Sequence, residues 1–140
     1  MISTFTPLTL FLAKAIGGYM VLAGLSGLTS PHRWEKLLED MRTSTALTYV
    51  TGVLVFALGT VMVYVHTFWT DPLAIIISVI AWATLIEGAL FIAIPEIFLK
   101  LSVSLLRPSA FKPFAISVIG FGLVLLTCGF IGVAGTLSAA

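Results

Sequence analysis

Charged residues are scarce in this chain of 140 residues: they make up 9% of it, against roughly 25% in typical soluble proteins. Hydrophobic residues make up 59%, so a soluble fold could not cover its surface with polar groups. The 7 basic residues exceed the 6 acidic ones by only one, which leaves no basic surface for nucleic-acid phosphates. These shortages favour an integral membrane protein, whose outer surface is solvated by lipid.

Cysteine is almost absent, since Cys128 is the only one. An internal disulfide and a Cys-pair metal site are therefore excluded. The sequence also lacks a Gly-rich phosphate loop, a nucleophile with a neighbouring base and a pair of carboxylates at one depth. We expect no enzyme, no metal site and no bound cofactor, and contacts with lipid instead.

Four long apolar runs are present, each near the roughly 20 residues that cross a hydrocarbon core. They cover residues 8–29, 44–65, 73–94 and 113–134. Only helices and closed barrels satisfy backbone groups in lipid, and these runs lack the alternation of barrel strands. The first run is too long for the apolar region of a signal peptide and has no Lys or Arg before it. The sequence predicts an all-α membrane protein with four transmembrane helices arranged as two tandem hairpins, the fourth helix having Pro113 in its first turn.

Basic residues lie on one side of the expected membrane. Six of the seven fall in the segments 31–43 and 96–112, and the segments on the other side carry none. The positive-inside rule then predicts cytoplasmic loops and periplasmic termini in a bacterial inner membrane. Both loops have apolar residues at helical spacing, so each is expected to be a short helix lying in the interface.

The two halves resemble each other. Gly24 lies seven residues before Pro31, and Gly88 lies seven residues before Pro95. Both halves keep one orientation, so the pattern predicts a parallel internal repeat within a single membrane domain. The two copies are expected at about 8–65 and 73–134.

Small residues recur at spacings that allow helices to approach closely, which is how helices associate in lipid. The residues expected to pack helices together, or to receive a partner's helix, are Gly17, Gly27, Gly52, Gly59, Gly88, Gly122 and Gly129. Other membrane subunits or further copies of the chain are the expected partners.

A motif near the middle of the chain carries a resemblance. It contains His66-Thr-Phe-Trp69 and then Trp82-Ala-Thr-Leu-Ile-Glu-Gly88. This resembles a widespread group of small, uncharacterised bacterial inner-membrane proteins with the pattern His-Asn-x-Trp followed by Trp-x-x-Leu-x-Lys-Gly. Thr67 stands in place of the usual Asn and Glu87 in place of the usual Lys, so a role of that lysine does not carry over. The resemblance implies a four-helix membrane protein of bacterial origin and brings no activity.

Glu87 is the one carboxylate well inside an apolar run, eight residues before Pro95. It is expected to be buried and hydrogen-bonded to polar residues at a similar depth, namely Tyr49, Thr51 or Ser117. The alternatives are contact with a partner subunit and the handling of protons or solutes, because an acid inside a membrane is often functional.

Trp34, His66 and Trp69 are expected to be interfacial anchors. His66 is also a weak candidate for ligating a haem or chlorophyll metal. The sequence therefore favours a non-catalytic accessory or structural subunit of a larger bacterial membrane complex. A small transporter or channel that uses Glu87 is the second hypothesis, and a pigment- or quinone-binding protein is the third.

Overall fold

The computed structural model describes residues 3–4, 6–105 and 107–134. Within them the chain forms α1 (Pro7–Thr29), α2 (Pro31–Thr43), α3 (Thr45–Val65), α4 (Pro72–Ala93), α5 (Pro95–Leu105) and α6 (Pro108–Ile131), with two short strands, β1 (Ser3–Thr4) and β2 (Val133–Ala134). Four of these helices, α1, α3, α4 and α6, are long and apolar enough to cross a membrane. The protein is therefore an all-α, multi-pass membrane protein, as the sequence predicts.

The helices begin where the sequence supplies caps. Thr6 and Asp71 accept hydrogen bonds from the backbone N–H groups of Thr9 and Ala74, and the residue after each cap is a proline. Proline suits the first helical position because its N–H would be unpaired there in any case. The fourth spanning helix begins earlier than predicted, because a second proline, at 108, takes this position and Pro113 then lies inside α6.

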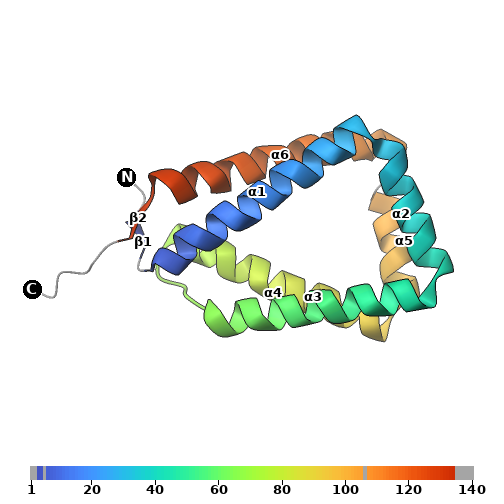
Figure 1. Ribbon diagram of the computed structural model, residues 1–140, viewed down its shortest axis with the longest axis horizontal. Helices are drawn as coiled ribbons and strands as arrows, with labels where there is room; N and C mark the ends of the chain where they lie inside the picture. The colour runs from blue at the N-terminus through green and yellow to red at the C-terminus, as the bar shows by residue number, and fades with distance from the viewer. Residues whose placement is uncertain (1–2, 5, 106, 135–140) are drawn as a thin grey trace, which may run out of the picture.

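The spanning helices pack in two pairs, α1 with α6 and α3 with α4 (Figure 1). The α3–α4 pair is a hairpin, whereas the α1–α6 pair joins the first and last helices of the chain. Two tandem hairpins would instead have paired α1 with α3 and α4 with α6. The predicted number of spanning helices is confirmed, but the predicted pairing of these helices is wrong.

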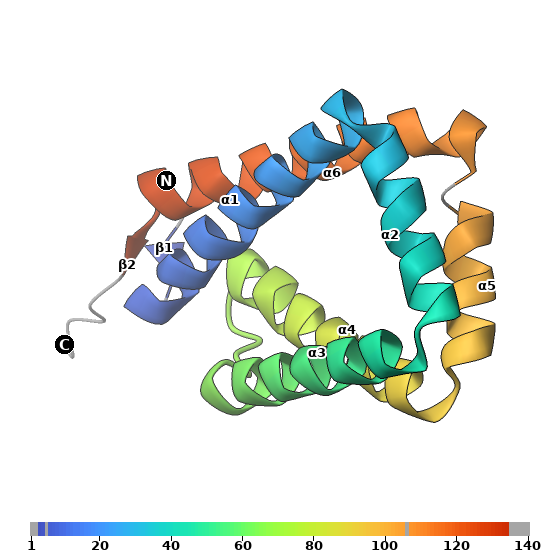
Figure 2. The ribbon, with the colours of Figure 1, turned by 45° about the vertical axis from the view of Figure 1, so that its right-hand side comes forward.

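The two pairs converge at one end and diverge toward the other (Figures 1 and 2). We call the end where α1 and α4 begin the narrow end. The opposite, wide end is closed by α2 and α5, which lie side by side across it. At the narrow end β1 pairs with β2 in parallel, with Ser3 opposite Val133.

Glycines bring the backbones of each pair together. A Cβ atom added at Gly17 would lie 2.7 Å from the carbonyl oxygen of Gly122. In the other pair, a Cβ atom at Gly59 would collide with the backbone of Leu85. Lipid gives apolar helices no hydrophobic drive to associate, so backbone contact of this kind supplies much of the attraction. The remaining expected packing glycines also face neighbouring helices: Gly27 lies against Phe111, Gly52 against Phe91, Gly88 against Phe56 and Gly129 against Lys14.

The contacts of the two pairs correspond residue by residue. Gly122 of α6 lies against Val21 of α1, and Gly59 of α3 lies against Leu85 of α4. If 64 is added to the residue number on α1 and 63 is subtracted from the residue number on α6, the contact Val21–Gly122 becomes the contact Leu85–Gly59. The same two shifts convert Gly24–Ile119 into Gly88–Phe56, and Gly27–Ala115 into Phe91–Gly52.

Two small clusters hold the pairs and the short helices in place. At the narrow end Ala13, Leu73, Ile77 and Leu125 form a buried core to which α1, α4 and α6 contribute. At the wide end Met41, Phe91 and Leu99 join α2, α4 and α5. The pairs therefore meet each other through side chains mainly at the narrow end.

We predict opposite effects of alanine at glycines of two kinds. Gly59→Ala and Gly88→Ala place a methyl group against neighbouring backbone and should each destabilise the fold by about 1–3 kcal/mol. Gly120→Ala is the matched control on α6, because no atom lies within 4 Å of its added Cβ. It should be neutral or slightly stabilising, since alanine is the better helix former. Unfolding of the purified variants in SDS-containing micelles measures both, and equal stabilities of all three would contradict the packing described above.

Candidate functional site

A buried polar cluster centred on His66 lies at the narrow end. His66 follows α3 directly, and its side chain is 0% exposed. Its Nε2 lies 2.9 Å from Oγ1 of Thr9 on α1, and its Nδ1 lies 3.2 Å from Oγ of Ser78 on α4. The ring therefore connects three helices.

The neighbouring bonds fix the roles of the two ring nitrogens. The Ser78 hydroxyl donates to the carbonyl oxygen of Phe68 at 2.9 Å, so it can only accept from His66. Nδ1 then carries the proton, and Nε2 accepts the hydrogen bond from the hydroxyl of Thr9. Thr9 in turn lies 2.8 Å from Oγ1 of Thr6. Each polar atom of the ring has a partner, as a buried network requires.

The surroundings of His66 keep the imidazole neutral. Burial lowers the pKa of His66 below its usual value of 6.5, while its backbone hydrogen bond and the charge of Asp71 act in the opposite direction. The ring also meets Phe68 edge-on, with centroids 5.2 Å apart. Both ring nitrogens of His66 are bonded to Thr9 and Ser78 in this arrangement, and ligation of a haem or chlorophyll metal by His66 stays a prediction.

The other expected anchors lie in different environments. Trp69 is half exposed near the narrow end, whereas His66, expected beside it in the interface, is enclosed because α1 covers it. Trp34 is partly buried, and its Nε1 donates to Oγ of Ser26 at 3.3 Å. Sequence reasoning missed Thr9 and Ser78, because an isolated hydroxyl in an apolar run usually bonds its own helix.

Glu87 is exposed rather than buried, in contrast to the sequence-based expectation. Its neighbour Gly88 faces α3, and one residue corresponds to a turn of about 100° around a helix, so Glu87 projects to one side of the surface that contacts α3. Glu87 follows Ile80 by seven residues and projects from the same side of α4. Since Ile80 packs against the core between the two helix pairs, Glu87 faces the space between the pairs.

The expected partners of Glu87 do not gather around it. Tyr49 is 57% exposed, and Thr51 is partly buried. The hydroxyl of Ser117 donates to the carbonyl oxygen of Pro113 at 2.8 Å. Among the described residues no hydrogen bond or ion pair includes Glu87. The polar residues lie at a common depth, but on helix faces that point in different directions.

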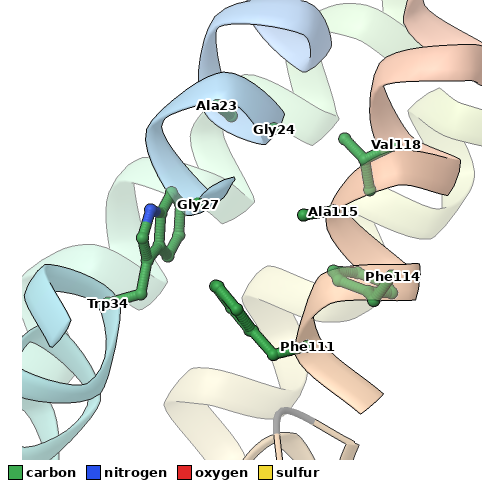
Figure 3. A pocket seen from close by; sticks show the side chains of 8 residues that line it. All are labelled: Ala23, Gly24, Gly27, Trp34, Phe111, Phe114, Ala115 and Val118. Atoms are coloured by element: carbon green, nitrogen blue, oxygen red, sulfur yellow. The ribbon is translucent and has the colours of Figure 1, made fainter. Parts of the chain in front are cut away.

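An apolar pocket of about 110 Å³ lies between α1, α2 and α6 (Figure 3). Its lining residues are Ala23, Gly24, Gly27, Trp34, Phe111, Phe114, Ala115 and Val118. Trp34 and Phe111 point into it from α2 and α6 (Figure 3). Its lining has no titratable group. Elsewhere in the described part of the chain no three His, Cys, Asp or Glu residues are grouped as a metal site would require.

These features define a four-span membrane protein with a satisfied polar cluster at one end and, in one span, an acid that has no partner within the described part of the chain. Residues 12–66 match the model of a family described as uncharacterized protein conserved in bacteria (DUF2065). The match agrees with the resemblance to small uncharacterised bacterial membrane proteins, and it covers α1 from Leu12 onward, α2, and α3 up to His66. No curated protein and no solved structure matches the chain.

We predict that His66 makes the fold sensitive to acid. Because its folded-state pKa lies below the unfolded value, the unfolded chain binds the proton more readily, and stability falls as pH drops below about 6.5 toward the folded-state pKa. Thermal unfolding in detergent between pH 8 and pH 5 measures this slope. His66→Gln should flatten it, whereas the control His32→Gln, at an exposed histidine, should leave it unchanged. A slope that survives His66→Gln would show that another group is responsible.

Proposed function

We propose that this protein is a non-catalytic accessory or structural subunit of a larger complex in the bacterial inner membrane. The observation that carries this proposal is the divergence of the two helix pairs. Phe114 and Phe121 lie on the same side of α6 as the buried Leu125, yet they are 52% and 41% exposed. The chain thus leaves large apolar side chains unpacked on the inner faces of its own helices.

The small buried fraction of each span supports the same proposal. In every spanning helix no more than 28% of the most apolar stretch is buried inside the chain. Lipid can cover the outer faces, but the inner faces diverge toward the wide end and are bounded there by α2 and α5. Faces of this shape suit helices of other subunits, which approach through small and apolar residues.

We infer further that the chain consists of two copies of one unit. The equal spacing of Gly24–Pro31 and Gly88–Pro95 supports this, and so do the corresponding contacts of the two helix pairs. The family match supports it independently, because it ends at His66 and thus spans a single α1–α2–α3 unit. On this interpretation the α1–α6 and α3–α4 pairs are one interface formed twice, as in a homodimer whose subunits have been joined.

The orientation follows from charge. Six basic residues lie on α2, on α5 or at the start of α6, all toward the wide end. The positive-inside rule supports a cytoplasmic position of this end, and on this proposal the narrow end with β1 and β2 faces the periplasm.

A small transporter or channel is the second candidate, and the exposure of Glu87 between the two pairs favours it. A path would have to continue through the narrow end. There the core of Ala13, Leu73, Ile77 and Leu125 is closed, and the His66 cluster is fully bonded. This closure is why we rank the accessory role first.

Cysteine labelling tests the orientation. In a Cys128→Ser background, Thr70→Cys at the narrow end and Glu39→Cys on α2 each introduce one exposed thiol. A membrane-impermeant maleimide added to intact spheroplasts should label Thr70→Cys at once and Glu39→Cys only after permeabilisation. The reverse order of labelling would invert the proposed topology.

Native purification tests the accessory role. The chain, with a mass of 14.9 kDa, should leave the membrane in mild detergent in a fixed ratio with another membrane protein. Phe114→Ala combined with Phe121→Ala should reduce that partner several-fold, because both changes remove inner-face side chains. Ile116→Ala is the matched control at an exposed position on another side of α6 and should not. Isolation of the chain alone, with solute flux in proteoliposomes or with a bound pigment, would support the rival functions instead.

A further inference from the structure

We propose that Glu87 marks the docking site for a transmembrane helix of a partner protein, and that this helix carries a Lys or Arg at the depth of Glu87. The inference rests on the proposed accessory role and names the chemistry of the partner. Glu87 lies eight residues before Pro95, which corresponds to about 12 Å along α4 at 1.5 Å per residue. It is therefore well inside the span, and an unpaired carboxylate there is costly in lipid.

Within the described residues no cationic side chain is paired with Glu87. Arg42 and Glu39 form an ion pair on α2 at the wide end, where the imidazole of His32 also lies 3.5 Å from Glu35. Lys14 lies on α1 with its Nζ 5.0 Å from the ring centroid of Phe130, which holds its charge toward the narrow end. A partner that brings a basic side chain would neutralise Glu87.

A second observation is that the two halves differ in shape at this point. Ala23 precedes Glu87 by 64 residues, the shift that relates α1 to α4, and lies beside Trp34 in the pocket of Figure 3. The residue related to Trp34 by the same shift is Phe98, which instead packs on Phe91 with ring centroids 4.5 Å apart. The first half therefore lines its inner face with an indole, whereas the second half leaves Glu87 exposed.

The surface around Glu87 suits a helix. Ala83 lies one turn earlier on the same side of α4 and is exposed. A small residue one turn from a polar one lets a second helix approach closely while the polar groups pair. A second copy of this chain fits less well, because Lys112 lies near the wide end of α6 and Lys14 is turned to the narrow end.

Site-specific photocrosslinking in the source membrane tests the proposal. A benzophenone amino acid is placed at position 83, beside Glu87, and in a separate variant at position 82, which lies about 140° around α4 from Glu87 and where Trp82 is 42% exposed. Position 83 should give an adduct with one other membrane protein, mapped to a spanning segment within one turn of a Lys or Arg. Position 82 should give mainly lipid adducts.

Charge variants complete the test. Glu87→Gln should reduce the protein adduct by about fivefold or more, the loss expected for a pair between helices in lipid. Glu87→Lys should abolish it, and exchange of the partner's basic residue for Glu should then restore it, which shows that the variant folds. An adduct with lipid alone, with a second copy or with a segment lacking a basic residue would overturn the proposal, and so would an adduct unchanged by Glu87→Gln. If the partner still co-purifies in those cases, the accessory role stands without this site; if none co-purifies, both proposals fail.

Discussion

The architecture of this protein depends on direct backbone contact between glycine-bearing helices. Gly17 and Gly122 bring α1 onto α6, and Gly59 and Gly88 bring α3 onto α4. In water, four such apolar helices would collapse together to bury their surfaces. In lipid that drive is absent, and association is strongest where backbones can approach. Each spanning helix presents at least one glycine to a neighbour, Gly88 being the single one in α4, and each has one close partner.

The divergence of the two pairs toward the wide end follows, because each helix uses its glycine-bearing face for one partner. The glycine-bearing faces are occupied within each pair. The faces that one pair turns toward the other carry bulky side chains such as Phe121, so the two pairs cannot approach each other as closely as the helices within a pair. Among the described residues the pairs meet mainly at the narrow end, where small and medium side chains pack around Ala13 and Ile77 and Thr9 bonds His66. The short helices α2 and α5 then bridge the separated wide ends, with Trp34 and Phe98 packed differently in the two halves.

His66 and Glu87 differ in burial and in hydrogen bonding, although both are polar residues among apolar ones. His66 has a partner for both ring nitrogens and is enclosed, so it stabilises the junction of three helices. Glu87 lies deeper in the span, yet it is exposed and has no partner among the described residues. The hydrogen bonds of His66 are satisfied within the described residues, whereas Glu87 has no such partner, and this difference is the reason for proposing a basic partner helix at Glu87.

The sequence by itself determined the number of spans, the short helices between them and the glycines that face neighbouring helices. These features depend on local composition and on helical periodicity, which are read directly from the order of residues. The tertiary structure alone decided that α1 packs on α6, that Thr9 and Ser78 enclose His66, and that Glu87 is separated from Tyr49 and Ser117. The depth of a residue in the membrane follows from its position along its helix. Which neighbour its side chain faces can be determined only when the positions of the other helices are known. Residues at one depth can therefore face opposite ways, and residues as distant in sequence as Thr9, His66 and Ser78 can share one hydrogen-bonded cluster.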